Sequence, residues 1–416
     1  MSQIMSQEVW DGFLAHRLRK GRFTWRSFVA ADDFVDSETY HPVVRRLSKG
    51  KGIGIPFKTV INKMGSGKKR VVYHFGNQEM AVLKLISHLL YRYDNLFASN
   101  CYAFRRGKRA SDTIFRLKRE IGGRKLWAYK VDIHDYFNSI SIPILLPILS
   151  RIFIDDPRLY SFFEKLLSDD RAYSGEKLVR EKRGVMAGTP TAPFLANVYL
   201  MEVDHHFENE GVIYARYSDD ILILADTEEE LTARKNELLD FFKQYHLEVN
   251  PSKEHVYAPG EAIDFLGFSM DGTEVGVSKS TLMKMKGKIR RKARSLHRWV
   301  SKADKDPMLA MKAMVNSFNR KFFEEGDPDT LSWSRWFFPV INSTEGLEEI
   351  DHYLQDNIRF LSTGKHNKAN YRVRYEDIKA LGYRSLVNEY HKFRQNRVYS
   401  RPVFSDRDDT FDNIRF

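Results

Sequence analysis

The chain has 416 residues, which is long for one ordinary domain and predicts two or three packed subdomains. Hydrophobic residues make up 42% and aromatic residues 13%, so most of the length can fold around a core. The formal net charge of +12 favours nucleic acid as a partner over a membrane surface. A basic protein without such a partner would have the same charge.

Cysteine usage and the N-terminal sequence further restrict the class of protein. Cys101 is the single cysteine, which excludes an internal disulfide framework and a cysteine-rich zinc site. The first 22 residues contain no apolar signal core, and the longest apolar run, Ile140 to Leu149, is short and holds two prolines. The sequence therefore predicts a cytoplasmic protein that does not cross a membrane.

The first predicted elements form a hairpin and a helix. Residues 57–63 and 69–75 are typical of two strands joined by a loop of small residues. Helical spacing follows over 78–97. Residues 125–132 then predict a strand that ends on the carboxylate of Asp132.

The middle of the chain predicts a second hairpin between two helices. A helix is expected over 191–210, and β-rich runs at 212–217 and 221–225 flank Ser218-Asp219-Asp220. A charged amphipathic helix is expected over 227–245, with Thr227 as its N-cap.

The composition changes after Gly272, where we place a subdomain boundary. Residues 279–300 have an apolar stripe at three- and four-residue spacing and a basic remainder that includes Lys288 and Arg291. The C-terminal third is predicted to be mainly helical, with a basic, polar interruption at 364–370.

The acidic residues at two of these positions suggest metal-dependent chemistry. Phosphoryl transfer is assisted by two metal ions that neutralise the attacking and leaving oxygens, and magnesium prefers carboxylate oxygens. Asp132 at a strand end and Asp219-Asp220 at a hairpin tip could supply such ligands. Taken singly, an Asp-Asp pair is also common in turns, and a strand-end Asp often caps a helix.

Over about residues 50–270 the chain resembles the reverse transcriptase family, through seven motifs in the family's order. They are the fingers hairpin (Ile61 to Arg70), the segment similar to YGFR-x-G (Cys101 to Gly107), motif A (Lys130 to Phe137), motif B (Gly184 to Asn197), the aromatic-X-Asp-Asp box (Tyr217 to Asp220), motif D (Asn250 to Lys253) and the primer-grip motif (Phe265 to Phe268).

The resemblance implies an α+β right-hand polymerase fold with fingers, an antiparallel-sheet palm and a helical thumb. The corresponding expected domains are an N-terminal region with fingers (1–125), a palm (126–272, with a fingers insertion at about 171–195) and a helical thumb with an RNA-binding region (273–416).

The family's catalytic roles carry over to matching positions. Asp132, Asp219, Asp220 and the carbonyl of Ile133 would hold two Mg²⁺ ions, and Lys253 would protonate the leaving pyrophosphate.

The resemblance also implies a set of nucleotide contacts. Lys68 and Arg70 would meet the incoming triphosphate, although they also fit a solvated hairpin tip. Phe137 would stack under the sugar, or is simply core. In motif B, Ala187 and Gly188 would adjoin the nucleotide, but Met186-Ala187-Gly188 stands where the family has Pro-Gln-Gly. The missing glutamine puts nucleotide selection and fidelity in doubt.

Nucleic-acid contacts are implied on three further segments. The expected contacts are Arg105, Arg106 and Lys108 with template phosphates, Phe265, Leu266 and Gly267 with the primer end, and Lys288 and Arg291 with nucleic acid. Lys365, His366, Lys368, Arg372 and Arg374 could grip a folded RNA, or form a solvated basic face.

The expected function is RNA-directed DNA polymerase activity without an attached nuclease. The tail, at 333–342 and 382–390, resembles defence-associated bacterial reverse transcriptases of the type 2 class. That resemblance implies a structured non-coding RNA template, dNTP substrates, a cDNA product and a role against phage. Two alternatives stay open: a template-independent or protein-primed DNA polymerase, and a non-catalytic RNA-binding scaffold. The oligomeric state also stays open.

Overall fold

The computed structural model describes residues 1–19, 33–62, 69–324, 332–365 and 367–399. The chain divides into two compact units, each with its own buried apolar side chains. Within the described residues, the first unit comprises Met1–Thr113 and Lys125–Pro259. The second comprises Ile114–Arg124 and the chain from Gly260 onward.

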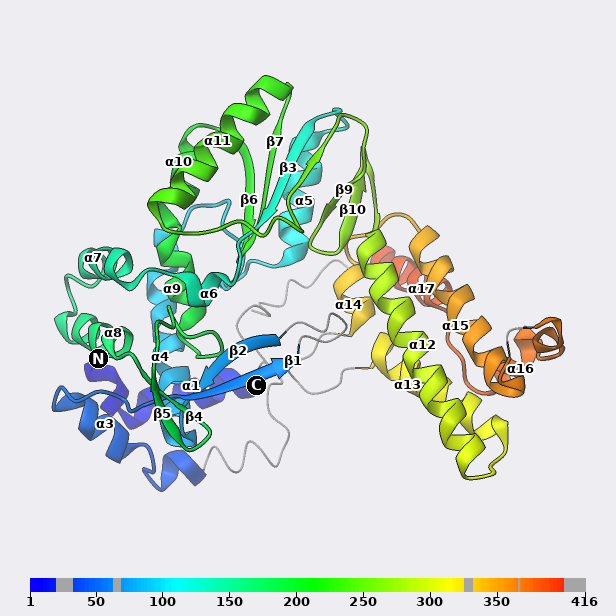
Figure 1. The fold of residues 1–416 in the computed structure, drawn as a ribbon, viewed down its shortest axis with the longest axis horizontal. Coiled ribbons are helices and arrows are strands. Elements are labelled where there is room, and N and C mark those ends of the chain that lie inside the picture. Colours follow the sequence, from blue (N-terminus) through cyan, green and yellow to red (C-terminus); the bar gives the residue numbers. More distant parts are fainter. Residues whose placement is uncertain (20–32, 63–68, 325–331, 366, 400–416) are drawn as a thin grey trace. The chain divides into compact units, whose positions relative to one another are not determined.

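One antiparallel sheet of the first unit has the strand order β6-β7-β3-β8, and its strands β6, β7 and β3 are seen near α11 in Figure 1. Its strands are β3 (Trp127–Asp132), β6 (Ile213–Tyr217), β7 (Asp220–Ala225) and β8 (His255–Tyr257). Tyr129 and Val131 of β3 and Ile221 and Ile223 of β7 are fully buried, because helix α11 packs against both strands. The hairpin predicted at 212–225 is confirmed.

A second sheet of the first unit has the order β2-β1-β4-β5. Its strands are β1 (Phe57–Asn62), β2 (Lys69–His74), β4 (Arg171–Ser174) and β5 (Lys177–Arg180). β1 pairs antiparallel with β2 and parallel with β4, so the predicted hairpin is confirmed and is extended by a hairpin more than 100 residues further along the chain. The loop 63–68 lies outside the described residues.

Helices complete the first unit. They are α1 (Gln7–Arg19), α3 (His41–Ser48), α4 (Asn77–Leu89), α6 (Tyr136–Ser139), α7 (Ile142–Ile152), α8 (Pro157–Ser168), α9 (Ala192–Tyr199), α10 (Met201–Asn209) and α11 (Glu228–Gln244), with short 3₁₀ helices η1 (Ser2–Met5) and η2 (Leu90–Leu96). The hydroxyl of Thr227 accepts a hydrogen bond from the Glu230 amide at 3.2 Å, which confirms it as the N-cap of α11.

Two helix predictions are corrected. Residues 191–210 form α9 and α10 rather than one helix, because Leu200 leaves the helical region with φ −104° and ψ 12°. The helix expected over 78–97 ends at Leu89 and continues as the 3₁₀ segment η2. No helix among the described residues is long and apolar enough to cross a membrane.

The second unit joins a small sheet to a set of helices. The sheet has the order β11-β10-β9, made of β9 (Ile263–Phe265), β10 (Phe268–Asp271) and β11 (Glu274–Val277). The helices are α5 (Ala110–Ile121, shared with the first unit), α12 (Lys279–Lys302), α13 (Pro307–Phe323), α14 (Trp333–Phe337), α15 (Glu345–Thr363), η3 (Lys368–Arg372), α16 (Tyr375–Ala380) and α17 (Leu386–Tyr399).

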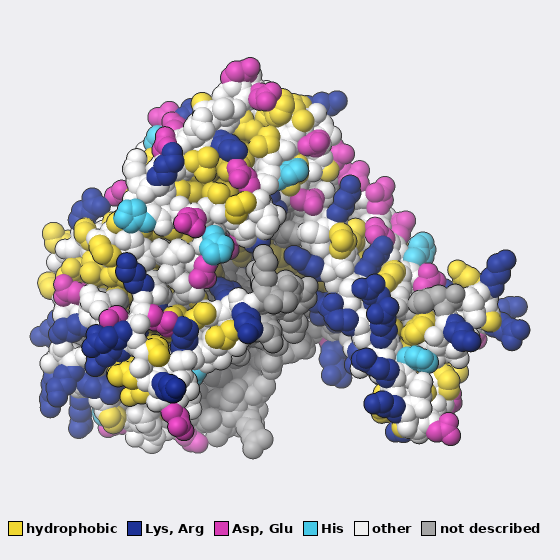
Figure 2. Space-filling model, viewed as in Figure 1, with side chains coloured by type: hydrophobic (Ala, Val, Ile, Leu, Met, Phe, Trp, Pro, Cys, Tyr) yellow, Lys and Arg dark blue, Asp and Glu magenta, His cyan; other side chains and the backbone are white. Residues whose placement is uncertain are grey.

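Helix α12 has the amphipathic character that its sequence predicts. Its six stripe residues are all buried, namely Leu282, Met285, Ile289, Ala293, Leu296 and Val300, and they pack against α15 and α13. Lys and Arg side chains gather over the outer face of α12, as Figure 2 shows. The helix therefore separates an apolar seam from a strongly basic surface.

Candidate active site

The three predicted aspartates come together at one end of the sheet β6-β7-β3-β8. Asp132 is the last residue of β3 and Asp220 the first of β7, and the antiparallel register makes them direct cross-strand partners. Side chains at such positions have Cβ atoms about 5 Å apart. The sheet therefore places two carboxylates side by side that are nearly 90 residues apart in the chain.

Asp219 is fixed to the same place by the turn before β7. Ser218 has a φ of +63°, which lets the chain reverse between Tyr217 and Asp220. The carbonyl of Asp219 then accepts a hydrogen bond from the amide of Ile133 at 3.1 Å. The turn is thus tied directly to the residue that follows Asp132.

The site carries a concentration of negative charge. Asp132 is buried, with 3% of its surface exposed. Burial, followed by the charges of Asp220 and Asp132, raises the pKa of Asp219 to about 7. The charges of Asp220 and Asp132 contribute to this shift, so a cation placed beside the three carboxylates would be favoured.

Motif D supplies the groups that contact Asp132. The ammonium of Lys253 forms an ion pair with Oδ2 of Asp132, and Nδ2 of Asn250 donates to Oδ1 at 3.3 Å. Burial acts to lower the pKa of Lys253, but the hydrogen bond to Asp132 and the charges of the aspartates outweigh it and raise that pKa. Lys253 is therefore held protonated beside the site. The sequence did not single out Asn250, although it lies in the quoted motif.

The donor set fits a hard divalent cation. Three carboxylates and the Ile133 carbonyl are the oxygen ligands that magnesium prefers. Among the described residues, no group of three or more His, Cys, Asp or Glu side chains is already gathered as a metal site. Lys253 and Asn250 occupy the oxygens of Asp132 instead, so an incoming cation would replace the ammonium.

The motif B loop packs against the residues that follow Asp132. Gly184 has a φ of +52°, and a Cβ there would lie 2.3 Å from the carbonyl oxygen of Phe137. The amide of Ala187 donates to Oδ1 of Asn138 at 3.2 Å, and its carbonyl accepts from the Tyr73 amide at 2.8 Å. Asn138 and Tyr73 were missed by the sequence reasoning, because their partners are distant in the chain.

The predicted nucleotide contacts have different environments. Phe137 is buried and makes edge contacts with Phe104 and Tyr136, and Ala187 is buried as well. Arg70 is exposed on β2. Gly188 has a positive φ of 103°. Lys68 lies outside the described residues.

The predicted template contacts require one correction. Arg105 is buried, and its guanidinium donates to Asp94 and to the carbonyls of Ala98 and Cys101. A guanidinium held in this way supports the backbone around it and is not presented to a phosphate.

Two neighbours of Arg105 remain compatible with the template role. Arg106 is exposed and stacks over Tyr91 at 4.1 Å. Lys108 donates to the carbonyl of Ser99 at 2.7 Å.

The remaining predicted contacts belong to the second unit. Leu266 and Gly267 form the tight turn between β9 and β10, with φ values of +52° and +88°, and Phe265 is buried. Lys288 and Arg291 lie on the basic surface of α12. Partial desolvation and then the charges of Lys321, Arg291 and Lys284 lower the pKa of Lys288. This crowding of cations would be relieved by an anionic partner.

A buried ion pair behind the aspartates was also missed. Arg216 and Asp204 are both 0% exposed, and Nε of Arg216 donates to Asp204 at 2.8 Å. The hydroxyl of Tyr214 donates to the same carboxylate at 2.9 Å. Nη1 of Arg216 also donates to the carbonyl of Ser218 at 3.3 Å, which supports the turn that carries Asp219. No periodic pattern in the sequence predicts a buried ion pair of this kind.

Comparison with known proteins settles the family. The family model described as reverse transcriptase (RNA-dependent DNA polymerase) matches residues 61–270, which is half of the chain and includes the three aspartates. This chain belongs to the reverse transcriptase family. The predicted α+β right-hand polymerase class is confirmed by this membership and by the antiparallel sheet that carries the aspartates.

Individual relatives of this reverse transcriptase are distant. The retron Ec86 reverse transcriptase of Escherichia coli is 24% identical over 106 residues, which cover 24% of this chain and about a third (33%) of that protein. Apo telomerase from Candida tropicalis is 12% identical, with a TM-score of 0.45 over 88% of this chain and 71% of that one. Telomerase from Candida albicans with a fragment of telomeric RNA is 13% identical, with a TM-score of 0.43 over 89% and 71%.

Proposed function

We propose that this reverse transcriptase copies an RNA template into DNA through a site that holds two magnesium ions. The observation that carries the proposal is the meeting of Asp132, Asp219 and Asp220 at one sheet end, with a pKa of Asp219 raised to about 7. A decayed polymerase site would have no reason to keep mutually repelling carboxylates. The scaffold alternative is therefore the less favoured reading.

The chain's own residues would divide the work of nucleotide transfer. Magnesium ions bound by the three aspartates and the Ile133 carbonyl would neutralise charge on the reacting phosphate oxygens. Lys253, held protonated by Asp132, would release that contact and donate its proton to the leaving pyrophosphate. Arg70 on β2 would meet the triphosphate, together with Lys68, which lies outside the described residues.

We propose that the shape of the site around Phe137 and motif B selects the nucleotide. Phe137 is fixed by its packing, and Gly184 allows the motif B loop to lie directly on the Phe137 carbonyl. Ala187 has no side-chain amide, so the contact that the family's glutamine makes would be missing. Selection would then depend on pairing with the template and on the packed loop.

The domain roles follow as proposals. The sheet β6-β7-β3-β8 would be the palm and the sheet β2-β1-β4-β5 part of the fingers. The helices from α12 onward would be the thumb, with Lys288 and Arg291 against nucleic acid. Phe265, Leu266 and Gly267 would hold the primer end, and Arg106 and Lys108 would contact template phosphates.

The biological setting is also a proposal. The template would be a structured non-coding RNA encoded beside the gene, and the cDNA would serve in defence against phage in the cytoplasm. The support is the resemblance of the tail to type 2 defence-associated enzymes, together with a basic surface on α12 that suits RNA.

The test is to express the chain with its flanking non-coding DNA and to sequence the nucleic acid that co-purifies with it. The matched variant carries Asp219→Ala and Asp220→Ala. We expect abundant cDNA complementary to one bound RNA in the wild type, and the same RNA without cDNA in the variant. Tandem repeats in the cDNA, made during phage infection, would support the type 2 assignment.

Three other outcomes would overturn parts of the proposal. Bound RNA with no cDNA in the wild type, even after phage challenge, would favour the scaffold. Homopolymeric DNA would show template-independent synthesis, to which the altered motif B could contribute. DNA that stays covalently attached to protein after protease-free denaturation would show priming from a side chain.

A further inference from the structure

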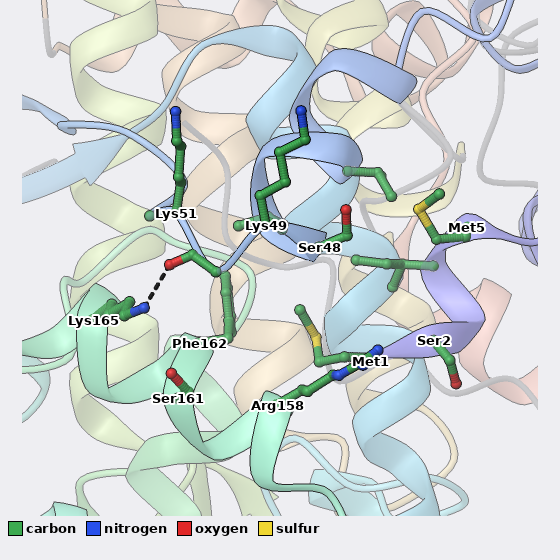
Figure 3. A pocket seen from close by; sticks show the side chains of 15 residues that line it. Met1, Ser2, Met5, Ser48, Lys49, Lys51, Arg158, Ser161, Phe162 and Lys165 are labelled. Atoms are coloured by element: carbon green, nitrogen blue, oxygen red, sulfur yellow. Dashed lines mark hydrogen bonds between the residues drawn. The ribbon is translucent and has the colours of Figure 1, made fainter.

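A cavity of about 310 Å³ lies in the first unit, away from the residues of the candidate active site (Figure 3). It is formed where the end of α3 and the following loop meet α8 and the 3₁₀ helix η1. The volume lies at the small end of the range for sites that hold small organic ligands. None of the roles proposed above uses it.

The floor of this cavity is apolar. Ile4, Val44, Leu47 and Phe162 line it and are buried, with no more than 7% of each residue exposed. The methionines Met1 and Met5 also line it. A flat, weakly polar group such as a nucleobase would gain contact with these side chains on leaving water.

The rim of the cavity is cationic. Four of the lining side chains, those of Lys49, Lys51, Arg158 and Lys165, carry a positive charge, and no Asp or Glu is among the residues that line the cavity. All four are exposed, and Figure 3 shows Lys49 and Lys51 extending in the same direction. The nearby Asp156 accepts hydrogen bonds from the Met1 amine at 2.7 Å and the Leu159 amide at 3.1 Å. Its charge is therefore partly compensated by groups other than the rim.

The loop that carries two of these cations is held in place. Nζ of Lys165 on α8 donates to the carbonyl of Gly50 at 2.5 Å, the contact drawn as a dashed line in Figure 3. Gly50 has a φ of +69°, and its amide donates to the Leu47 carbonyl at 2.9 Å. Lys49 and Lys51 are thus attached to a fixed backbone, which lowers the entropy cost of binding an anion there.

We propose that this cavity binds one unstacked nucleotide of an RNA strand, with the base on the apolar floor and the adjoining phosphates on the four cations. Sequence-specific RNA recognition commonly takes single-stranded bases into apolar or aromatic sites, with Lys and Arg on the backbone. The inference rests on the proposed function, because the strand would be the RNA that the enzyme carries. It adds a grip on that RNA outside the polymerase site.

The experiment uses the full chain and an oligo(U) RNA that contains photoreactive thiouridine. Two variants change the cavity in different ways. Ser161→Trp places a neutral, bulky side chain in it, and the pair Lys49→Glu with Lys51→Glu reverses the charge of the rim. The charge-matched control is Lys125→Glu with Lys243→Glu, because both lysines are exposed in the first unit and neither lines the cavity.

In the wild type and the control we expect crosslinks to map to the peptide that contains Phe162. Both cavity variants should lose these crosslinks and bind the oligonucleotide about tenfold more weakly, as for the loss of one stacked base. Thermal unfolding of each variant, measured in parallel, shows that the fold is kept. Extension of oligo(dT) on poly(rA), which tests the polymerase itself, should be unchanged in the cavity variants.

Crosslinks that map only to other peptides, or equal binding by wild type and Ser161→Trp, would refute the site. Competition by uridine monophosphate at the concentration of the oligonucleotide would show that the cavity binds a free nucleotide. It would refute binding of an RNA strand there. A wild type that crosslinks at Phe162 but does not extend oligo(dT) would keep the site and refute the proposed function. The two failures are thus distinguishable.

Discussion

Two groups of carboxylates in the first unit differ in how their charge is balanced. Asp204 receives the guanidinium of Arg216 and the hydroxyl of Tyr214, so its oxygens are matched by internal donors. At the sheet end, burial and then the charges of Asp220 and Asp132 raise the pKa of Asp219 to about 7. A carboxylate that only stabilises the fold has its charge balanced by donors of the protein itself. A cluster of carboxylates that repel one another is instead suited to binding a cation from solution.

The largest expected effect comes from removing one charge of the repelling cluster. Asp219→Asn should lower primer extension by about 10³-fold or more, because metal ligation contributes several kcal/mol to phosphoryl transfer. The thermal midpoint without metal should stay the same or rise, because a repulsion is removed. Primer-extension rates and a thermal melt measure both. A variant that melts earlier would mean that Asp219 stabilises the fold, and the comparison would fail.

The buried pair of Asp204 and Arg216 should respond in the opposite way, with a loss of stability. Asp204→Leu leaves the Arg216 guanidinium buried without its partner, which typically costs about 3–5 kcal/mol. The expected result is an early unfolding transition in a denaturant titration. Adding Arg216→Met should recover most of the loss, because a buried pair can be exchanged for apolar side chains. If the double variant unfolds as early as the single one, the pair has a role beyond charge balance.

A smaller effect is expected at the contact between the cluster and Lys253. Lys253→Met removes both the cation on Asp132 and the proposed proton donor. Turnover should fall by about 10²-fold, within the usual range for general acid catalysis. Binding of Mn²⁺, followed by its paramagnetic resonance signal, should become tighter, because the metal no longer competes with an ammonium. Weaker Mn²⁺ binding would show that Lys253 assists the metal site instead.

The smallest expected effect concerns the packing of motif B on the segment that follows Asp132. Gly184→Ala brings a Cβ to within 2.3 Å of the Phe137 carbonyl, so the loop must move. We expect a higher KM for dNTP and about 1–3 kcal/mol of lost stability. Gly211→Ala is the matched control, since Gly211 has a similar φ of +67° and open space around its Cβ position. Equal KM values for the two variants would show that motif B does not contribute to nucleotide binding.

Local patterns in the sequence predicted much of the fold. The stripe on α12 matches its buried residues, Thr227 caps α11, and both hairpins are present. Such features depend on the period of a helix or strand and on turn chemistry, which operate over a few residues. The order of the motifs likewise pointed to the three aspartates before any geometry was known.

Long-range pairing decided the rest. Arg105 and Arg106 are adjacent and chemically alike, yet only the structure shows that Arg105 is buried on Asp94 while Arg106 is exposed. The cross-strand register of Asp132 with Asp220, and the pair of Arg216 with Asp204, depend on segments that meet only after folding. A sequence pattern shows which face of an element is buried, but the tertiary structure chooses the partner that compensates each buried charge.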